Sequence, residues 1–116
     1  MSIRNIPLLV VDDEPAMRRL LRTSLHLQGY RVLESATGLE ALAVIEREAP
    51  EVVVLDLGLP DVDGLEVIRR LRSAGSKVPI VVLSNRGDER GKVEALDLGA
   101  DDYVTKPFGM AEQPQQ

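Results

Sequence analysis

Short apolar runs alternate along this chain with segments in which apolar residues recur at helical spacing. The first run, residues 8–11, contains only Leu and Val, and from Pro15 the apolar positions follow a period of three to four residues. Repeats of this alternation predict strands at residues 8–11, 31–35, 52–55, 79–83 and 103–105. They predict helices at residues 15–28, 37–49, 64–72 and 89–98. Five strands alternating with four helices predict an α/β domain with a parallel sheet covered on both faces.

Proline, glycine and capping residues mark the ends of the predicted helices. Pro15 is tolerated in a first helical turn, and Gly29 is placed to end the helix that Pro15 begins. Thr37 and Glu40 have the spacing of a capping box, and Pro50 ends the helix that follows. These local signals agree with the hydrophobic periodicity, so the two kinds of pattern support the same set of elements.

Composition narrows the function classes. A length of 116 residues suits one domain, and 44% hydrophobic with 28% charged residues is typical of a globular protein. The absence of cysteine excludes disulfides, zinc-thiolate sites and cysteine nucleophiles. A net charge of -5 argues against binding to nucleic acid by this chain itself. No apolar run is long enough to span a membrane, and residues 1–7 do not resemble a signal peptide, so we expect a cytoplasmic protein.

Polar residues of a particular kind follow the predicted strands. Ligands of parallel α/β sheets bind beyond the carboxyl ends of the strands. The residues predicted at that edge are Asp12, Asp13, Asp56, Ser84 and Lys106. Each has an ordinary explanation by itself, as a helix cap, a strand end or a solvated lysine. Together they form a much more specific set of three acids, a hydroxyl and a lysine.

Electrostatics makes a cluster of three carboxylates informative. Within about 5 Å of one another, each pair repels by roughly 3 kcal/mol at an effective dielectric constant near 20. Such a cluster therefore either takes up protons or binds a cation. Hard oxygen ligands that leave positions open for water and phosphate suit Mg2+. The residues thus have the chemistry of a phosphoryl-transfer site, in which a metal and a lysine neutralise oxygens and one acid is the nucleophile.

Four stretches of the chain carry a resemblance to a known family: residues 10–14, 55–64, 82–84 and 99–108. In this order they resemble the receiver domains of two-component response regulators, over residues 8–109. Further stretches, at residues 56–61, 83–86 and 92–109, are similar to the potassium-uptake (Kdp-type) branch of the OmpR/PhoB winged-helix regulators. The resemblance implies a receiver domain at residues 1–109 with a flavodoxin-like (CheY-like) doubly wound fold and strand order 2-1-3-4-5.

The resemblance also implies a role for each acid of the cluster. Asp56 is the expected phosphoacceptor, which takes a phosphoryl group from a sensor histidine kinase. Asp13 and Asp56 are expected to bind Mg2+ directly, with the carbonyl of Gly58 as a third ligand and Asp12 acting mainly through water. Lys106 is expected to pair with Asp56 and then with the phosphoryl oxygens.

A conformational switch is implied at two further positions. Ser84 is expected to hydrogen-bond the phosphoryl group, and Tyr103 to turn inward when Ser84 moves. The signal is expected to be read on the face formed by the fourth helix and fifth strand, which is also a candidate dimer interface. Gly58, Asn85 and Arg86 stand where the family's side chains vary, and we expect them to tune phosphoryl lifetime or access.

The carboxyl-terminal residues depart from the family pattern. Residues 110–116 form a polar tail with a proline, where a receiver continues into a fifth amphipathic helix. We expect this helix to be missing or truncated, which leaves one sheet face open for a second copy or another chain. DNA is then a partner only through an effector domain outside this chain.

Three other functions remain open. A Mg2+ phosphatase of the haloacid dehalogenase type also uses an aspartyl nucleophile, but that family places Asp-x-Asp after its first strand, whereas residues 56–58 follow the third. A flavodoxin-like cofactor binder needs a phosphate-binding loop after the first strand, where residues 12–14 repel anions. A non-phosphorylated interaction module would more readily have lost Asp13, Asp56 or Lys106.

Overall fold

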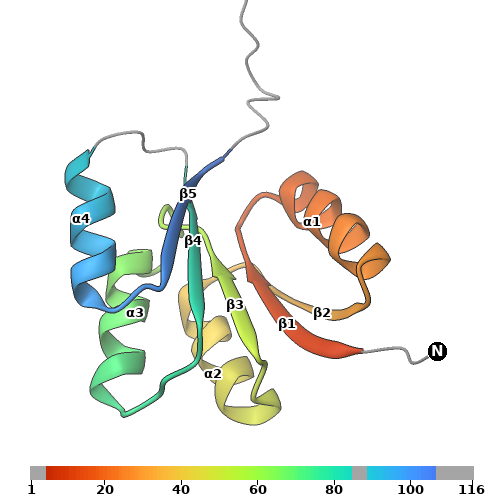
Figure 1. The fold of residues 1–116 in the computed structure, drawn as a ribbon, viewed down its shortest axis with the longest axis horizontal. Helices are drawn as coiled ribbons and strands as arrows, with labels where there is room; N and C mark the ends of the chain where they lie inside the picture. Colours follow the sequence, from red (N-terminus) through yellow and green to blue (C-terminus); the bar gives the residue numbers. More distant parts are fainter. Residues whose placement is uncertain (1–4, 85–88, 107–116) are drawn as a thin grey trace, which may run out of the picture.

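A computed structural model describes residues 5–84 and 89–106 of the chain. Five parallel strands form one sheet in the order β2-β1-β3-β4-β5 (Figure 1). The strands are β1 (Ile6–Val11), β2 (Tyr30–Ser35), β3 (Val52–Leu55), β4 (Ile80–Ser84) and β5 (Asp102–Thr105). The helices are α1 (Pro15–Leu27), α2 (Gly38–Glu48), α3 (Gly64–Ser73) and α4 (Glu89–Leu98). The predicted fold class and strand order are confirmed.

The helix ends lie close to where the local signals predict them. Pro15 begins α1, and Gly29 follows its end with a φ of 99°, a left-handed conformation that glycine adopts without strain. The hydroxyl of Thr37 accepts a hydrogen bond from Glu40 N at 3.1 Å, as in a capping box. Asp63 caps α3 in the same way, through a bond from Leu65 N. Local sequence therefore sets these boundaries to within a residue or two.

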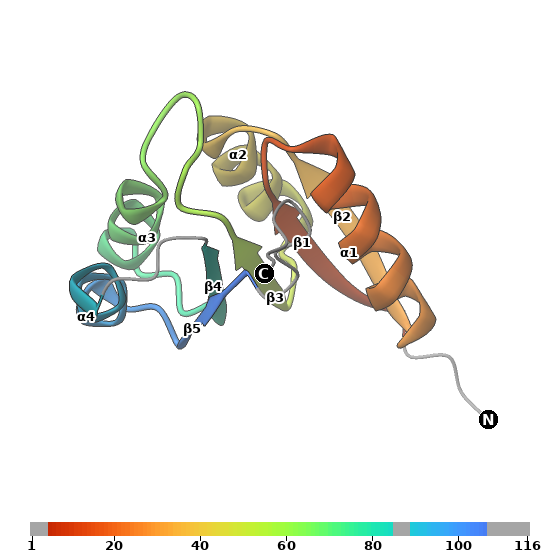
Figure 2. The same ribbon diagram turned by 90° about the horizontal axis from the view of Figure 1, so that it is seen from above.

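Most of the core lies on one face of the sheet. The helices α2, α3 and α4 lie together on that face, whereas α1 lies on the other (Figure 2). Alternate residues of the central strands point into the larger core, where Val53, Leu55, Ile80 and Val82 are fully buried. On the α1 face, Leu8 and Val10 of β1 are buried together with Met17 of α1.

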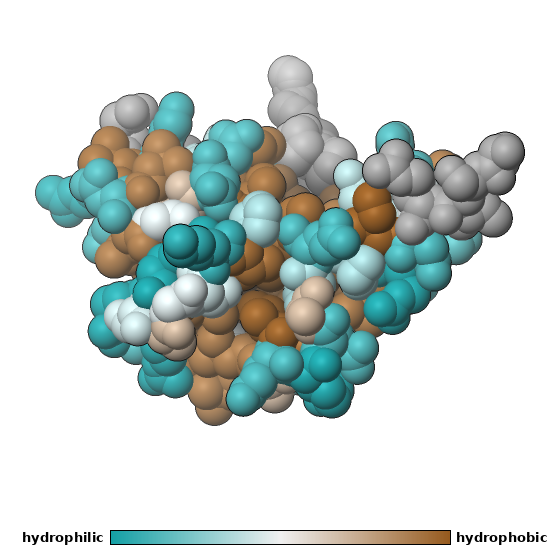
Figure 3. All heavy atoms as spheres, turned by 60° about the horizontal axis from the view of Figure 1, so that its bottom comes forward, coloured by the Kyte–Doolittle hydropathy of each residue, from teal (hydrophilic) through white to brown (hydrophobic). Residues whose placement is uncertain are grey.

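The α1 face is less completely covered at β3, β4 and β5. Val54 and Val81 are neighbours in the sheet and only half-buried, and Val104 is 38% exposed. No described helix covers this part of the sheet, and the predicted loss of the fifth helix concerns residues outside the described ranges. Apolar side chains also reach the surface among polar ones on the side seen in Figure 3. Association through the open face stays a prediction.

Candidate functional site

The topology brings the first two acids of the site together. β1 and β3 are neighbours, with Val11 paired to Leu55, although α1, β2 and α2 separate them along the chain. The residue after each strand is an aspartate, so Asp12 and Asp56 emerge side by side at the carboxyl edge. The chain leaves β1 toward β2 on one side and later returns to β3 on the other, so the acids lie where ligands of doubly wound sheets bind.

The predicted cluster of three carboxylates is present. Asp12, Asp13 and Asp56 each offer an oxygen within 4.8 Å of the others. Nζ of Lys106 lies 3.1 Å from Asp12 Oδ2 and 3.3 Å from Asp56 Oδ1. It also lies 3.4 Å from the exposed Glu14 carboxylate. One lysine therefore contacts acids from two neighbouring strand ends.

The backbone of β4 helps to place this lysine. Lys106 follows β5, and its N–H donates a hydrogen bond of 2.6 Å to the carbonyl of Ser84 at the end of β4. The lysine side chain is only 10% exposed and extends past β4 to the acids of β1 and β3. Four of the five strands thus contribute to one small region.

Burial makes the charges of the site interact strongly. The side chains of Asp12 and Asp56 are 2% and 7% exposed, whereas Asp13 is open to solvent. Burial raises the pKa of Asp56, and the charge of Asp12 raises it further, although Lys106 acts in the opposite direction. Burial lowers the pKa of Lys106, but the charges of Asp56 and Asp12 outweigh that effect and raise it overall. Lys106 therefore remains a cation at neutral pH.

The donor set fits Mg2+. Three carboxylates and one ammonium sum to a formal charge of -3 + 1 = -2, so the cluster lacks positive charge. Asp12 Oδ2 is buried, and its contact with Lys106 Nζ is an ion pair rather than a well-directed hydrogen bond, so this oxygen can still accept a ligand. All three acids offer hard oxygen ligands, and Asp13 is exposed where solvent can complete a coordination shell. These are the properties that a site for a hydrated divalent cation requires.

The loop from β3 to α3 places no side chain next to the acceptor at residue 58. A Cβ at Gly58 would lie 3.7 Å from Asp56 Oδ2, so glycine there adds no further cover to the carboxylate. At the far end of the loop, a Cβ at Gly64 would lie 2.7 Å from the carbonyl oxygen of Asp56. The start of α3 therefore packs directly against the backbone of the acceptor residue.

The two predicted switch residues share one face of the sheet. Ser84 and Tyr103 lie on neighbouring strands, and the register pairs Val82 with Tyr103 and Ser84 with Thr105. Side chains two residues apart point to the same face, so Ser84 and Tyr103 both belong to the face that α4 covers. Ser84 is buried, and Tyr103 is half-buried against the core. Asn85 and Arg86 lie outside the described residues.

One arginine of α1 contacts the acidic loop. Nη1 of Arg18 donates a hydrogen bond to the carbonyl of Asp12 at 2.7 Å. Its Nε contacts Glu34 of β2 at 3.2 Å, and Arg22 binds the same carboxylate at 2.6 Å. Glu34 is on the α1 face of β2, so this ion pair turns Arg18 toward the sheet, where it also ties α1 to the acidic loop.

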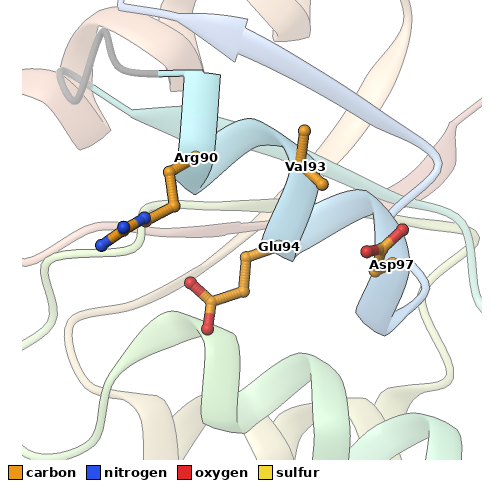
Figure 4. A pocket seen from close by; sticks show the side chains of 4 residues that line it. All are labelled: Arg90, Val93, Glu94 and Asp97. Atoms are coloured by element: carbon orange, nitrogen blue, oxygen red, sulfur yellow. The ribbon is translucent and has the colours of Figure 1, made fainter.

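Surface hollows lie apart from the acidic cluster. One of about 480 Å3 is lined by Arg90, Val93, Glu94 and Asp97, all of α4, with Glu94 directed toward α3 (Figure 4). None of the predicted site residues lines it. The chemistry of the described residues is therefore concentrated at the carboxyl edge of the sheet rather than in the hollow on α4.

The family comparison agrees with this geometry. The family model described as the response regulator receiver domain matches residues 8–115. The chain belongs to the receiver domain family of response regulators. This membership makes the receiver domain a signalling module rather than a classical enzyme, and it disfavours the phosphatase and cofactor-binding alternatives.

Curated relatives support the narrower resemblance. The transcriptional regulatory protein KdpE of Mycobacterium tuberculosis is 53% identical over 104 residues, which are 90% of this chain and 46% of that protein. The KDP operon transcriptional regulatory protein KdpE of Escherichia coli is 52% identical over the same shares. The predicted similarity to the Kdp-type branch is confirmed. The chain spans about half the length of these relatives.

A solved structure supports the fold. The receiver domain of the Francisella response regulator 1452 superposes with a TM-score of 0.85 at 32% identity, over 92% of this chain and 88% of that one. In addition, no helix among the described residues is long and apolar enough to cross a membrane.

Proposed function

We propose that this receiver domain accepts a phosphoryl group on Asp56 from the phosphohistidine of a sensor histidine kinase, in a reaction that depends on Mg2+. The observation that carries the proposal is the buried Asp56 carboxylate, 3.3 Å from the Lys106 ammonium and within 4.8 Å of two further carboxylates. Family membership supplies the kind of donor, because receiver domains belong to two-component systems.

The residues of the chain suit each part of the reaction. A carboxylate oxygen of Asp56 attacks phosphorus, and the bond from phosphorus to the histidine nitrogen of the kinase breaks. Lys106 offsets the charge of the phosphoryl oxygens from a side chain already held among the acids. Asp12, Asp13 and the Gly58 carbonyl are the proposed partners of Mg2+, which supplies positive charge at the transferred group when bound.

The proposed output is a change at Ser84 and Tyr103. Phosphorylation replaces the single negative charge of the Asp56 carboxylate with a phosphoryl group of about -1.5 to -2 charges, near Ser84 at the end of β4. Because Tyr103 shares a sheet face with Ser84, a movement of one can alter the packing of the other against α4. Through this change we propose that the domain regulates transcription by way of a DNA-binding domain outside this chain, as the names of the KdpE relatives indicate.

Intact-protein mass spectrometry tests the proposal. The chain is incubated with acetyl phosphate and Mg2+, and the same reaction is run with a chelator and with Asp56→Asn. The expected result is the mass of one added phosphoryl group on the unaltered chain, absent in both controls. No mass gain in a protein whose circular dichroism shows it to be folded would refute the proposed phosphoacceptor.

A further inference from the structure

A second acid of the β3–α3 loop makes contacts that its local sequence does not indicate. Asp61 lies in the turn before α3, two residues before Asp63, which caps that helix. The Asp61 carboxylate instead reaches the start of α2, where Oδ1 accepts from Gly38 N at 2.8 Å and Oδ2 accepts from Leu39 N at 2.9 Å. The bonded residues are more than twenty positions apart, so Asp61 joins two elements rather than capping its own helix.

These bonds complete the amino terminus of α2. The first N–H groups of a helix have no partner within the helix. The Thr37 hydroxyl accepts a hydrogen bond from Glu40 N, and the Asp61 carboxylate accepts hydrogen bonds from the N–H groups of the two residues that precede Glu40. The hydrogen bonds from α2 also lower the pKa of Asp61, with the bond from Leu39 N as the largest cause. Asp61 is therefore ionised at neutral pH and suited to the positive end of the helix.

Tight packing accompanies the hydrogen bonds. A Cβ at Gly38 would lie 2.4 Å from Cγ2 of Val62 and 3.5 Å from Oδ1 of Asp61. Glycine at this position therefore lets the β3–α3 loop lie directly against the first residue of α2. The loop is held there by the Val62 side chain packed against Gly38 and by two hydrogen bonds to a charged acceptor, which are stronger than bonds between neutral groups.

The same loop carries groups that are proposed to bind the metal and to accept the phosphoryl group. It begins at Asp56, and Gly58 contributes the proposed carbonyl ligand three residues before Asp61. Residues 58–62 are exposed or half-buried, and Asp61 is the one charged residue among them. Leu59 and Val62 pack against the core, and among the hydrogen bonds given for the described residues those of Asp61 tie residues 58–62 to a neighbouring element.

We propose that Asp61 is a positioning residue, which fixes the loop against α2 so that the Gly58 carbonyl and the Asp56 carboxylate face a bound cation together. The inference deepens the proposed function and rests on it for the role of Gly58. Groups that orient metal ligands typically alter affinity by about 10–100-fold when they are removed. Because Asp61 acts through three residues of backbone, we expect a weakening of Mg2+ binding of about tenfold in Asp61→Ala, at the lower end of that range.

Two matched controls separate positioning from other effects of the substitution. Thr37→Ala removes a hydrogen bond from the same end of α2 without touching the loop, so it measures the effect of a weaker helix start. Asp63→Asn removes a charge from the same loop and keeps an acceptor oxygen for Leu65 N, so it measures the effect of charge. Asp61→Asn keeps one acceptor for α2 and should lie between the unaltered chain and Asp61→Ala.

The experiment measures Mg2+ affinity by calorimetric titration and, separately, the Mg2+ concentration for half-maximal phosphorylation by acetyl phosphate. Positioning predicts that Asp61→Ala raises both values about tenfold and that both controls stay within about twofold of the unaltered chain. The positioning role would be overturned if Asp61→Ala and Thr37→Ala changed Mg2+ binding equally. It would also be overturned if Asp61→Asn and Asp63→Asn did so. If Asp61→Ala does not fold, Asp61→Asn is compared with the same controls.

The calorimetric arm distinguishes the two proposals. A chain that binds Mg2+ but takes no phosphoryl group contradicts the proposed function, whereas Asp61 is still judged by the affinities. A chain that is phosphorylated normally, with unchanged Mg2+ dependence in Asp61→Ala, contradicts only the positioning role. A chain that binds no Mg2+ contradicts both.

Discussion

Removal of the lysine at the centre of the acidic cluster should make the fold depend on Mg2+. Lys106 Nζ lies 3.1 Å from Asp12 Oδ2 and 3.3 Å from Asp56 Oδ1, and both carboxylates are buried. At an effective dielectric constant of about 20, the attraction to Asp12 alone is about 5 kcal/mol before the cost of desolvation is counted. Loss of one partner of a buried ion pair typically destabilises a protein by about 3–5 kcal/mol. Since the exposed Asp13 side admits solvent, we expect about 3 kcal/mol for Lys106→Met in a chelator at neutral pH.

The stability difference between Lys106→Met and the unaltered chain should depend on pH and on Mg2+, and this dependence identifies the lost charge as its cause. The pKa of Lys106 is raised in the folded state, so its contribution is full below the ordinary lysine value of 10.5 and is lost as pH rises through the folded value. At acid pH the carboxylates of the variant take up protons, which removes the repulsion that the lysine offset. The difference between the two proteins should therefore be largest near neutral pH and should decrease in excess Mg2+, because bound cation replaces part of the missing charge.

Urea unfolding followed by far-UV circular dichroism measures the effect, with chelator or Mg2+ present. Lys77→Met is the matched control, because Lys77 is exposed and the loss of an exposed charge usually changes stability by less than about 0.5 kcal/mol. Equal stabilities of Lys106→Met and the unaltered chain in chelator would refute the electrostatic reasoning. If Mg2+ did not reduce the stability difference between Lys106→Met and the unaltered chain, the lost stability would be assigned to packing of the lysine side chain instead.

Three further predictions concern the acceptor and its surroundings. Asp56→Asn should stabilise the chain in chelator at neutral pH, because the raised pKa of Asp56 means that its charge opposes folding. In urea titrations this gain in stability should appear as the pH rises above 3.8, the ordinary pKa of the group, and should be absent below it. Gly64→Ala should lower the free energy of unfolding by about 1–3 kcal/mol in the same assay, since the new Cβ would lie 2.7 Å from both the Asp56 carbonyl oxygen and Leu57 Cα. An unchanged midpoint of urea unfolding would contradict that clash. Arg72→Met should lower the free energy of unfolding by about 2 kcal/mol, because Nε and Nη2 of Arg72 donate to the carbonyl of Gly99 at 3.1 and 2.8 Å. Hydrogen exchange should show faster opening of the turn before β5, and protection equal to that of the unaltered chain would exclude a role of Arg72 in holding this turn.

Local patterns predicted the elements well because their causes are local. The boundaries of β3 and α4 match the predicted ranges, and Thr37 caps α2 as the capping box indicates. Helical periodicity and cap chemistry act within a few residues, so they can be read without knowledge of the fold. The cap of α3 is equally local, since Asp63 Oδ1 accepts from Leu65 N, two positions away.

The acidic cluster was also predictable, although its members are far apart in the chain. Parallel strands bring their carboxyl ends to one edge, so an acid after β1, an acid after β3 and a lysine after β5 must lie near each other once the strands are recognised. The strand order itself came from family resemblance rather than from periodicity. Sequence therefore determined which side chains meet, and the distances of 3.1 and 3.3 Å around Lys106 were added by the structure.

Contacts between surfaces were decided only by the tertiary structure. Arg18 turns toward Glu34 and the Asp12 carbonyl, and Asp61 bonds α2 rather than its own turn. Both side chains are flexible and polar, and either can satisfy its charge locally or across an interface at similar cost. Sequence periodicity fixes which face of an element is apolar, but the choice between polar partners depends on how neighbouring elements are placed, and that follows from the packing of the whole sheet.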